Sequence, residues 1–237
     1  MNNIELIFPE IFISLSIMFL LILGVFKKNS SKIIHNISLL VLLITAVITF
    51  NETVSINRST LFNESIVIDY LSSFMKIITL IAAFVVLLIS SNYLRTFKIF
   101  KIEYPILILS SVLGMMIMIS SNDLIVFYMG LELQSLALYV LATFNRDQLK
   151  SSEAGLKYFV LSALSSGLLL YGCSLIYGFT GSTNFNVIAT QFNTNEYALT
   201  FGIVFVLVGL SFKISAVPFH MCCLLYTSPS PRDGSES

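Results

Sequence analysis

Seven apolar runs divide this chain, and each is long enough to cross the hydrocarbon core of a bilayer as a helix. They fall near residues 9–26, 33–50, 74–92, 104–121, 123–143, 158–178 and 198–219. Because lipid offers the backbone no hydrogen-bond partner, only helices and closed barrels span a membrane, and runs of this length predict helices. We therefore expect an all-α fold, a polytopic transmembrane bundle of about seven helices.

The composition agrees with a membrane protein and argues against other classes. Hydrophobic residues make up 56% of the chain and charged residues only 11%, far from the averages of soluble domains. Thirteen basic and thirteen acidic side chains cancel, so no excess of positive charge predicts binding to nucleic acid. The lipid bilayer is the expected surrounding of the chain.

Charged residues alternate in sign between successive connections of the expected helices. Basic residues follow the first, third and fifth helices, whereas the second connection is mainly acidic and the sixth carries only Glu196. The basic set is Lys27, Lys28, Lys32, Arg95, Lys98, Lys101, Arg146, Lys150 and Lys157. By the positive-inside rule these connections lie on the cytoplasmic or matrix side, which predicts an N-terminus outside.

The cysteines and glycines form no recognisable cofactor or metal motif. Cys173 lies in an apolar run, and Cys222 and Cys223 are adjacent, which is not the ligand spacing of an iron–sulfur cluster. Neither a dinucleotide-binding glycine motif nor a phosphate loop occurs. We expect this chain to bind no cofactor and no metal, and any redox chemistry that it serves to take place in another subunit.

Glu132 is the most informative single residue, because it lies in the middle of the apolar segment LIVFYMGLELQSLALYVL, residues 124–141. A carboxylate at that depth is costly and by default marks a functional site turned toward protein or water. Tyr128, Ser135 and Tyr139 recur with it at helical spacing and form one polar stripe. A proton or ion path is expected along this stripe, and a structural pair that fixes helix packing is the alternative.

Lys213, in the segment GLSFKISAVPFH, is the expected partner of Glu132. Pro218 lacks a backbone donor and obstructs the carbonyl of Ile214, which predicts a break in the seventh helix, with the lysine about one and a half turns before the helix end. Broken helices at membrane depth commonly line cavities and ion sites. Two such groups could pass on a proton as they move together or apart, whereas snorkelling of Lys213 to the interface is the alternative.

Four further polar residues receive lesser roles. Lys157, at the entry to the sixth helix, and His220, which titrates near neutral pH, are candidate contributors to a proton path. Lys76 is expected to snorkel from the third helix, and Asp123 to cap the start of the fifth.

Small residues recur at four-residue spacing in the sixth apolar run. Ser162 with Ser166, and Ala163 with Gly167, predict seams along which neighbouring helices approach closely.

Three segments together resemble one family of membrane proteins. They read LGMMIMISSNDLIVFYMGLELQSLALYVLATFNRD, SSEAGLKYFVLSALSSGLLLYGCSLIYGFTG and VGLSFKISAVPFHM. These segments, and residues 5–221 more broadly, resemble subunit N of the proton-pumping NADH:quinone oxidoreductase, called subunit 2 in mitochondria. The segments GLELQSL and SEAGLKYF are specific to this resemblance rather than general apolar sequence.

The resemblance implies a membrane-arm subunit of respiratory complex I, related to cation/proton antiporters and built from two inverted five-helix repeats. The family's glutamate falls on Glu132 and its lysine in the broken helix on Lys213, which act as a pair in proton translocation. NADH, FMN, iron–sulfur clusters and quinone would be bound by partner subunits, so this chain would be a non-redox subunit of the enzyme. Its location would be a bacterial inner membrane or the mitochondrial inner membrane.

The resemblance also sets the expected domain organisation. Residues 1–103 would hold three N-terminal transmembrane helices, and residues 104–221 the first four helices of an antiporter-like repeat. Family members continue beyond Met221 into further helices, whereas residues 222–237, CCLLYTSPSPRDGSES, turn polar and are expected to be a disordered, non-native tail. The repeat would be incomplete, and the chain alone is not expected to be catalytic.

A subunit of a multisubunit cation/proton antiporter is the alternative function, because such proteins share the broken helix and the pair of charged residues. The GLELQSL and SEAGLKYF segments favour the quinone reductase. A purely structural scaffold would leave Glu132 and Lys213 unexplained.

Overall fold

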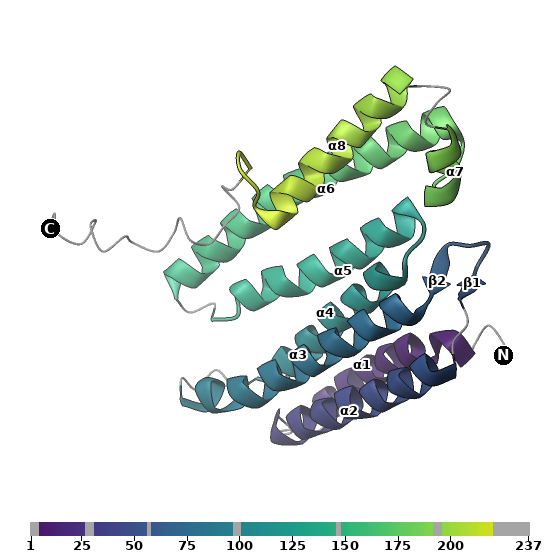
Figure 1. Ribbon diagram of the computed structural model, residues 1–237. Coiled ribbons are helices and arrows are strands. Elements are labelled where there is room, and N and C mark those ends of the chain that lie inside the picture. The colour runs from purple at the N-terminus through teal and green to yellow at the C-terminus, as the bar shows by residue number, and fades with distance from the viewer. Residues whose placement is uncertain are drawn as a thin grey trace, which may run out of the picture. The chain divides into compact units, whose positions relative to one another are not determined.

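The computed structural model of the chain describes residues 5–26, 31–55, 58–96, 101–145, 148–191 and 196–219. Its helices are α1 (Phe8–Phe26), α2 (Ser31–Ser55), α3 (Tyr70–Thr96), α4 (Glu103–Ser120), α5 (Leu124–Ala142), α6 (Leu149–Thr180), α7 (Phe185–Gln191) and α8 (Glu196–Ile214) (Figure 1). A 3-10 helix, η1 (Glu5–Ile7), precedes α1, and strands β1 (Ser59–Leu61) and β2 (Ile66–Ile68) pair between α2 and α3. The chain forms two compact units, Met1–Leu141 and Ala142–Ser237.

The predicted polytopic helical bundle is confirmed. The six helices from α1 to α6 are long and apolar enough to cross a membrane, and α8 contains a shorter apolar stretch, Leu199–Ile214. The seventh expected helix is therefore present, but it ends at Ile214 rather than near residue 219.

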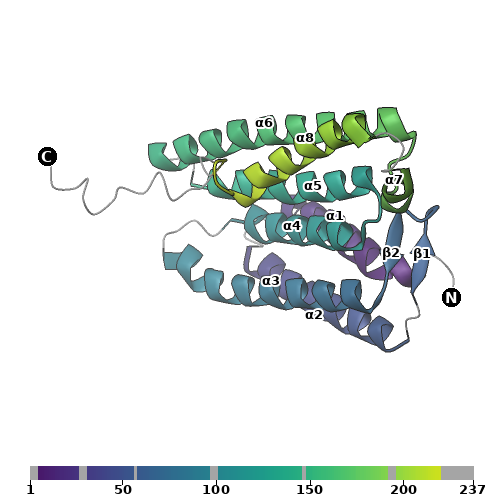
Figure 2. The ribbon, with the colours of Figure 1, turned by 45° about the horizontal axis from the view of Figure 1, so that its top comes forward.

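In the first unit, α1 to α4 pack around one apolar core. Helix α1 contacts α2 and α4, and α3 also contacts α2 and α4 (Figure 2). The fully buried core side chains are Ile13, Leu20, Ile34, Leu42, Leu80, Leu87, Leu109, Val112 and Met116. Large apolar side chains such as Leu15 and Ile89 remain on the outside, as expected for helices that face lipid.

A β-hairpin occupies the second connection, which the sequence predicted as a loop. Strands β1 and β2 are antiparallel, and the turn residues from Phe62 to Glu64 have positive φ angles of 50, 54 and 66°. The backbone N–H of Asn122 donates to the Ser65 carbonyl at 2.8 Å, and its side-chain amide donates to the Glu64 carbonyl at 2.8 Å. The hairpin is thereby fixed to the connection between α4 and α5.

The sixth connection, residues 179–197, also differs from its prediction as a loop. It contains the short helix α7, which has no buried residue. Seven residues are too few to produce a clear helical period in the sequence.

Helices α4 and α5 approach each other through two glycines. A Cβ atom on Gly114 would lie 2.6 Å from the Gln134 backbone nitrogen and 2.8 Å from the Gly130 carbonyl oxygen. A Cβ atom on Gly130 would lie 2.8 Å from the Met118 backbone nitrogen. Since the obstacles are backbone atoms, only glycine allows this contact, and small residues of this kind let membrane helices approach closely.

In the second unit, α6 packs against α8 along a similar small-residue contact. The Ser165 hydroxyl donates to the Gly209 carbonyl at 2.8 Å, and a Cβ atom on Gly172 would lie 2.7 Å from the Val206 backbone nitrogen. The side chain of Leu169 leaves no room for a Cβ atom on Gly209.

The predicted small-residue seams of α6 are only partly correct. Ser162 and Ser166 are buried, at 2% and 7% exposure, as a packing seam requires. Ala163 is exposed, and a Cβ atom on Gly167 would meet nothing within 4 Å, so the seam predicted through these two residues is wrong. The close contacts lie instead on the face of Ser165 and Gly172, because that face is turned to α8.

Replacing Gly130 with alanine is expected to force α4 and α5 apart, because the new methyl group meets backbone atoms that cannot move aside. We expect a loss of about 1–3 kcal/mol of folding free energy. The loss is measured as a lower unfolding midpoint of the purified chain in mixed detergent micelles. Gly167→Ala on α6 is the matched control, and equal midpoints for the two variants would contradict the close contact.

Candidate functional site

Glu132 lies near the middle of α5 and is half-buried. The neighbouring stripe residues Ser135 and Tyr139 are 7% and 6% exposed, and the Ser135 hydroxyl donates to the Glu132 backbone carbonyl at 3.1 Å. Gly130 faces α4, and Glu132 lies about 200° further round the helix at about 100° per residue. The polar stripe is therefore on the side of α5 that is turned away from α4.

The exposed apolar surface of α5 borders the stripe on one side. Ile125, Met129, Leu136 and Val140 are 48%, 60%, 50% and 50% exposed and recur at helical spacing. The helix thus has a face against α4, an exposed apolar face and a polar stripe.

Asp123 caps the start of α5, as the sequence predicted. Its carboxylate oxygen Oδ1 accepts a hydrogen bond from the Ile125 backbone at 2.8 Å, and its carbonyl accepts one from Phe127 at 2.9 Å. The cap satisfies backbone donors at the helix start and fixes where α5 begins.

Lys213 lies in the last turn of α8, which ends at Ile214. Ser215 follows with a positive φ of 58°, so the helix breaks three residues before Pro218. The predicted break beside the lysine is confirmed, whereas the expectation that Lys213 lies one and a half turns before the helix end is wrong. The break falls early because the proline ring obstructs the carbonyl four positions back.

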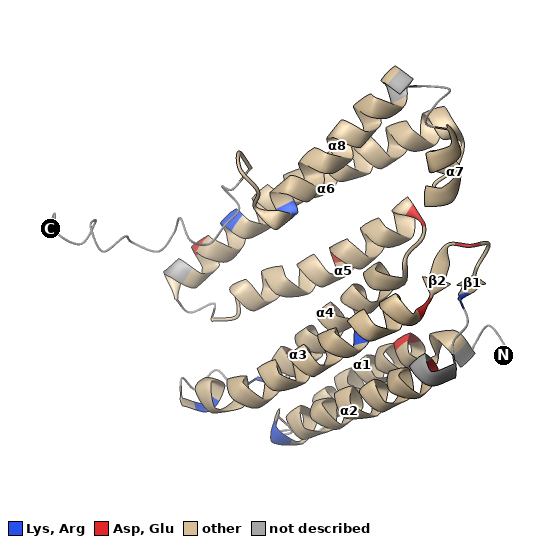
Figure 3. Cartoon of the chain, in the orientation of Figure 1, with Lys and Arg blue, Asp and Glu red and all other residues tan. Residues whose placement is uncertain are grey.

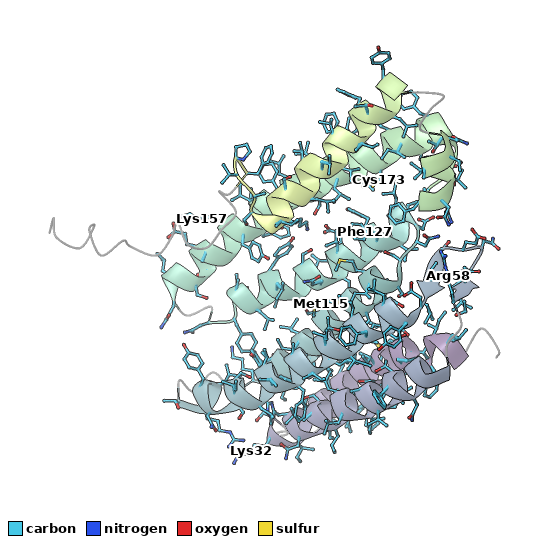
Figure 4. All side chains as sticks on the ribbon, in the orientation of Figure 1. Lys32, Arg58, Met115, Phe127, Lys157 and Cys173 are labelled. Carbon is cyan, nitrogen blue, oxygen red and sulfur yellow. The ribbon has the colours of Figure 1, made fainter. Side chains whose placement is uncertain are left out.

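Lys157 is the ninth residue of α6 rather than a residue at its entry, because α6 begins earlier than predicted. Its ammonium lies 2.6 Å from Glu153 Oε1, and the two side chains are 53% and 54% exposed. Figure 4 shows Lys157 toward the start of α6. An exposed pair one helical turn apart contributes little to stability.

The candidate residues fall in both units. Glu132 belongs to the first unit, and Lys157 and Lys213 belong to the second. Gly209 lies against Leu169 and Gly202 against Ile176, so α6 and α8 run antiparallel. Both lysines therefore lie toward the same end of that helix pair. His220 and the segment 222–237 lie outside the described residues.

A buried ion pair in the first unit went unnoticed in the sequence. The Lys76 ammonium lies 2.6 Å from Glu10 Oε1, and the two side chains are 4% and 11% exposed. The prediction that Lys76 snorkels is wrong, because α1 supplies a carboxylate partner inside the bundle. Glu52, near the end of α2, lies within electrostatic range of both groups.

The sequence does contain a signal that could have predicted this ion pair, which is the alternating direction of successive membrane helices. An antiparallel order places the start of the first helix beside the end of the second and the start of the third. Ionisable residues at those positions, Glu10, Glu52 and Lys76, could have been grouped on that basis.

Metal binding has no candidate site in the described part of the chain, where no group of three or more His, Cys, Asp or Glu residues could hold an ion.

Comparison with known proteins gives consistent matches. A family model described as NADH:quinone oxidoreductase/Mrp antiporter, TM, matches residues 121–230. NADH-quinone oxidoreductase subunit N of Pelagibacter ubique is 72% identical over 93% of this chain and 47% of that protein. The subunit N of Maricaulis maris is 50% identical over 93% of this chain and 46% of that protein. The chain spans about half the length of these curated relatives.

Solved structures share the fold. A chain of respiratory complex I from Thermus thermophilus matches with a TM-score of 0.75 and 26% identity, over 90% of this chain and 45% of that one. A chain of the Mrp complex from Dietzia has a TM-score of 0.76 at 21% identity, over 94% of this chain and 43% of that one, and shows the fold alone.

The described residues thus form an apolar helical bundle of antiporter-like fold, with a carboxylate within α5 and with α8 ending beside a lysine. The resemblance to subunit N of NADH:quinone oxidoreductase, first drawn from the segments around Glu132, Lys157 and Lys213, is confirmed by the matches over 93% of the chain.

Removing one partner of the buried pair is expected to destabilise the first unit strongly. Glu10→Leu would remove the carboxylate that directly contacts the buried Lys76 ammonium and leave only Glu52 within electrostatic range, which costs about 3–5 kcal/mol. The double variant Glu10→Leu/Lys76→Met removes both charges and should recover most of that loss. Unfolding midpoints of the wild type, the two single variants and the double variant form a complete cycle. Additive effects would contradict a direct pair.

Proposed function

We propose that this chain acts in proton translocation, as part of a membrane-arm subunit of NADH:quinone oxidoreductase. The observation that carries the proposal is Glu132, a carboxylate within an apolar helix, on a polar stripe turned away from α4. The 72% identity to the Pelagibacter subunit N supports this function over a cation/proton antiporter. The likeness to the Mrp complex, at 21% identity, extends only to the fold.

In the proposed mechanism, Glu132 and Lys213 act as an electrostatic pair. Attraction across a low-dielectric interior favours the charged forms of both groups when they are near each other. When the two groups move apart, burial favours the neutral amine, and Lys213 would release a proton. We assign Lys157 and His220 to the path as further proton carriers, since an ammonium and an imidazole can both give up and regain a proton.

The redox steps belong to other subunits in this proposal. NADH, FMN, iron–sulfur clusters and quinone would be bound there, and quinone reduction would drive the movement of charge at Glu132. The chain itself would be a non-redox subunit that contacts neighbouring membrane-arm subunits within an inner membrane of a bacterium or mitochondrion.

We further propose that the hairpin side of the first unit faces outside, together with the N-terminus. The described basic residues Lys32, Arg95 and Lys101 lie at the helix ends opposite the hairpin, whereas Glu64 and Asp69 lie in or beside it (Figure 3). Figure 4 shows Lys32 and Arg58 at these two opposite ends. This distribution follows the positive-inside rule with Arg58 as the exception.

Replacing Glu132 with glutamine in the complete enzyme should abolish proton transfer by this side chain while keeping its size. We expect proton pumping coupled to quinone reduction to fall about a hundredfold or more, the lower range for loss of a proton-transfer group. Proton uptake by membrane vesicles, measured with a pH-sensitive dye, checks the loss. Glu103→Gln, an exposed position at the start of α4, is the control and should pump normally. Normal pumping by Glu132→Gln would overturn the assignment.

Orientation is tested by cysteine labelling in a background without native cysteines. Asn63→Cys, in the hairpin turn, should react with a membrane-impermeant thiol reagent added to intact cells or mitoplasts. Lys101→Cys, before α4, should react only after the membrane is opened. The reverse pattern would invert the proposed topology.

A further inference from the structure

The first unit contains an ionisable cluster that is separate from the stripe of α5. It consists of Glu10 on α1, Glu52 on α2 and Lys76 on α3, and we call it the N-terminal triad. The Glu10 and Lys76 side chains are joined at 2.6 Å, and Glu52 interacts electrostatically with both. Three consecutive helices therefore each bring one ionisable group to the same end of the bundle.

Only one oxygen of Glu10 is used by the ion pair. Oε1 binds Lys76, while Oε2 is buried and has no hydrogen-bond partner within the described ranges of the chain. Burying a carboxylate oxygen without a hydrogen-bond donor costs folding free energy, so we expect this atom to bind a further ligand.

A cavity of about 270 Å³ lies beside Glu10. Its walls are mostly apolar and include Ile11 and Ile117, with the hydroxyl-bearing Ser14 and Ser120 as its other polar residues. A water molecule occupies about 30 Å³ in the liquid, so the space holds several. Glu10 and the two serines supply the polar contacts that such waters need.

The charge balance of the triad favours one bound proton. Two carboxylates and one ammonium carry one excess negative charge when all are ionised, and an uncompensated charge in an apolar bundle is costly. Among the described residues that line the cavity, none is basic. Helix α4 contributes Leu113, Ile117 and Ser120, and β2 contributes Ile66.

A further carboxylate, at the start of α3, already has a structural role. Asp69 precedes α3, and its Oδ1 accepts a hydrogen bond from the Ser72 backbone at 2.8 Å. It acts as the cap of α3, and it would add negative charge rather than neutralise the triad.

We propose that the N-terminal triad is a second protonation site, which takes up one proton from water in the cavity beside Glu10. The proton leaves a hydronium ion and forms an O–H bond on a carboxylate of the triad, with no transfer of electrons. The occupied site is neutral overall: one carboxylic acid, one carboxylate and the Lys76 ammonium. The site uses no residue of α5 or α8 and is independent of the function assigned to Glu132.

Infrared difference spectroscopy of the full 237-residue chain in lipid nanodiscs tests this site. Spectra recorded between about pH 5 and about pH 9 should contain the C=O band of a protonated carboxyl that persists at neutral pH. Glu10→Gln and Glu52→Gln should each remove this band, because either change leaves one carboxylate balanced by Lys76. Lys76→Met should increase the band about twofold, since two carboxyls then need protons.

The controls separate this site from the proposed function. Glu132→Gln and the surface variant Glu103→Gln should leave the neutral-pH band of the triad unchanged, and all variants are compared only if they elute as a single species with wild-type helix content. If neither Glu10→Gln nor Glu52→Gln alters a carboxyl band, both groups are ionised throughout and the triad is a structural ion pair. Should Lys76→Met fail to fold, the two glutamine variants still decide the question.

Discussion

The structure depends on one constraint, which is that lipid supplies neither hydrogen bonds nor counter-charges to a buried polar group. The Glu10 and Lys76 side chains meet this constraint by pairing at 2.6 Å inside the first unit. Buried hydroxyls meet it locally, as Thr45 and Thr49 each donate to the backbone carbonyl four residues earlier. A polar side chain that remains inside an apolar helix therefore has a structural partner or a function.

Helix packing follows from the same surroundings. Apolar side chains gain little by leaving lipid for a neighbouring helix, so close backbone contact and interhelical hydrogen bonds have to hold the helices together. Gly114 and Gly130 provide such a contact in the first unit, and Ser165 with Gly209 provides one in the second. The contact through Gly130 also orients α5, which places Glu132 on the side away from α4.

The sequence was sufficient for features that depend on local chemistry. Apolar length predicted the spanning helices, and the short polar segment before α5 predicted the Asp123 cap. Features that depend on distant partners were missed. The hairpin has strands of three residues, too short for a period-two pattern, and the Lys76 pair joins residues 66 positions apart. The pairing of Glu132 with Lys213 stays a prediction, because spacing along the chain carries no distance between units.

The most direct test of the central claim compares two cysteines on adjacent faces of α5 in the complete enzyme. Met129 belongs to the exposed apolar face and is 60% exposed. Glu132 lies on the polar stripe and is less exposed than Met129. If the stripe lines a hydrated proton path, Glu132→Cys should ionise and react with a small charged thiol reagent, and Met129→Cys, facing lipid, should not. Faster reaction of Met129→Cys, or no reaction at Glu132→Cys, would contradict a proton path along α5.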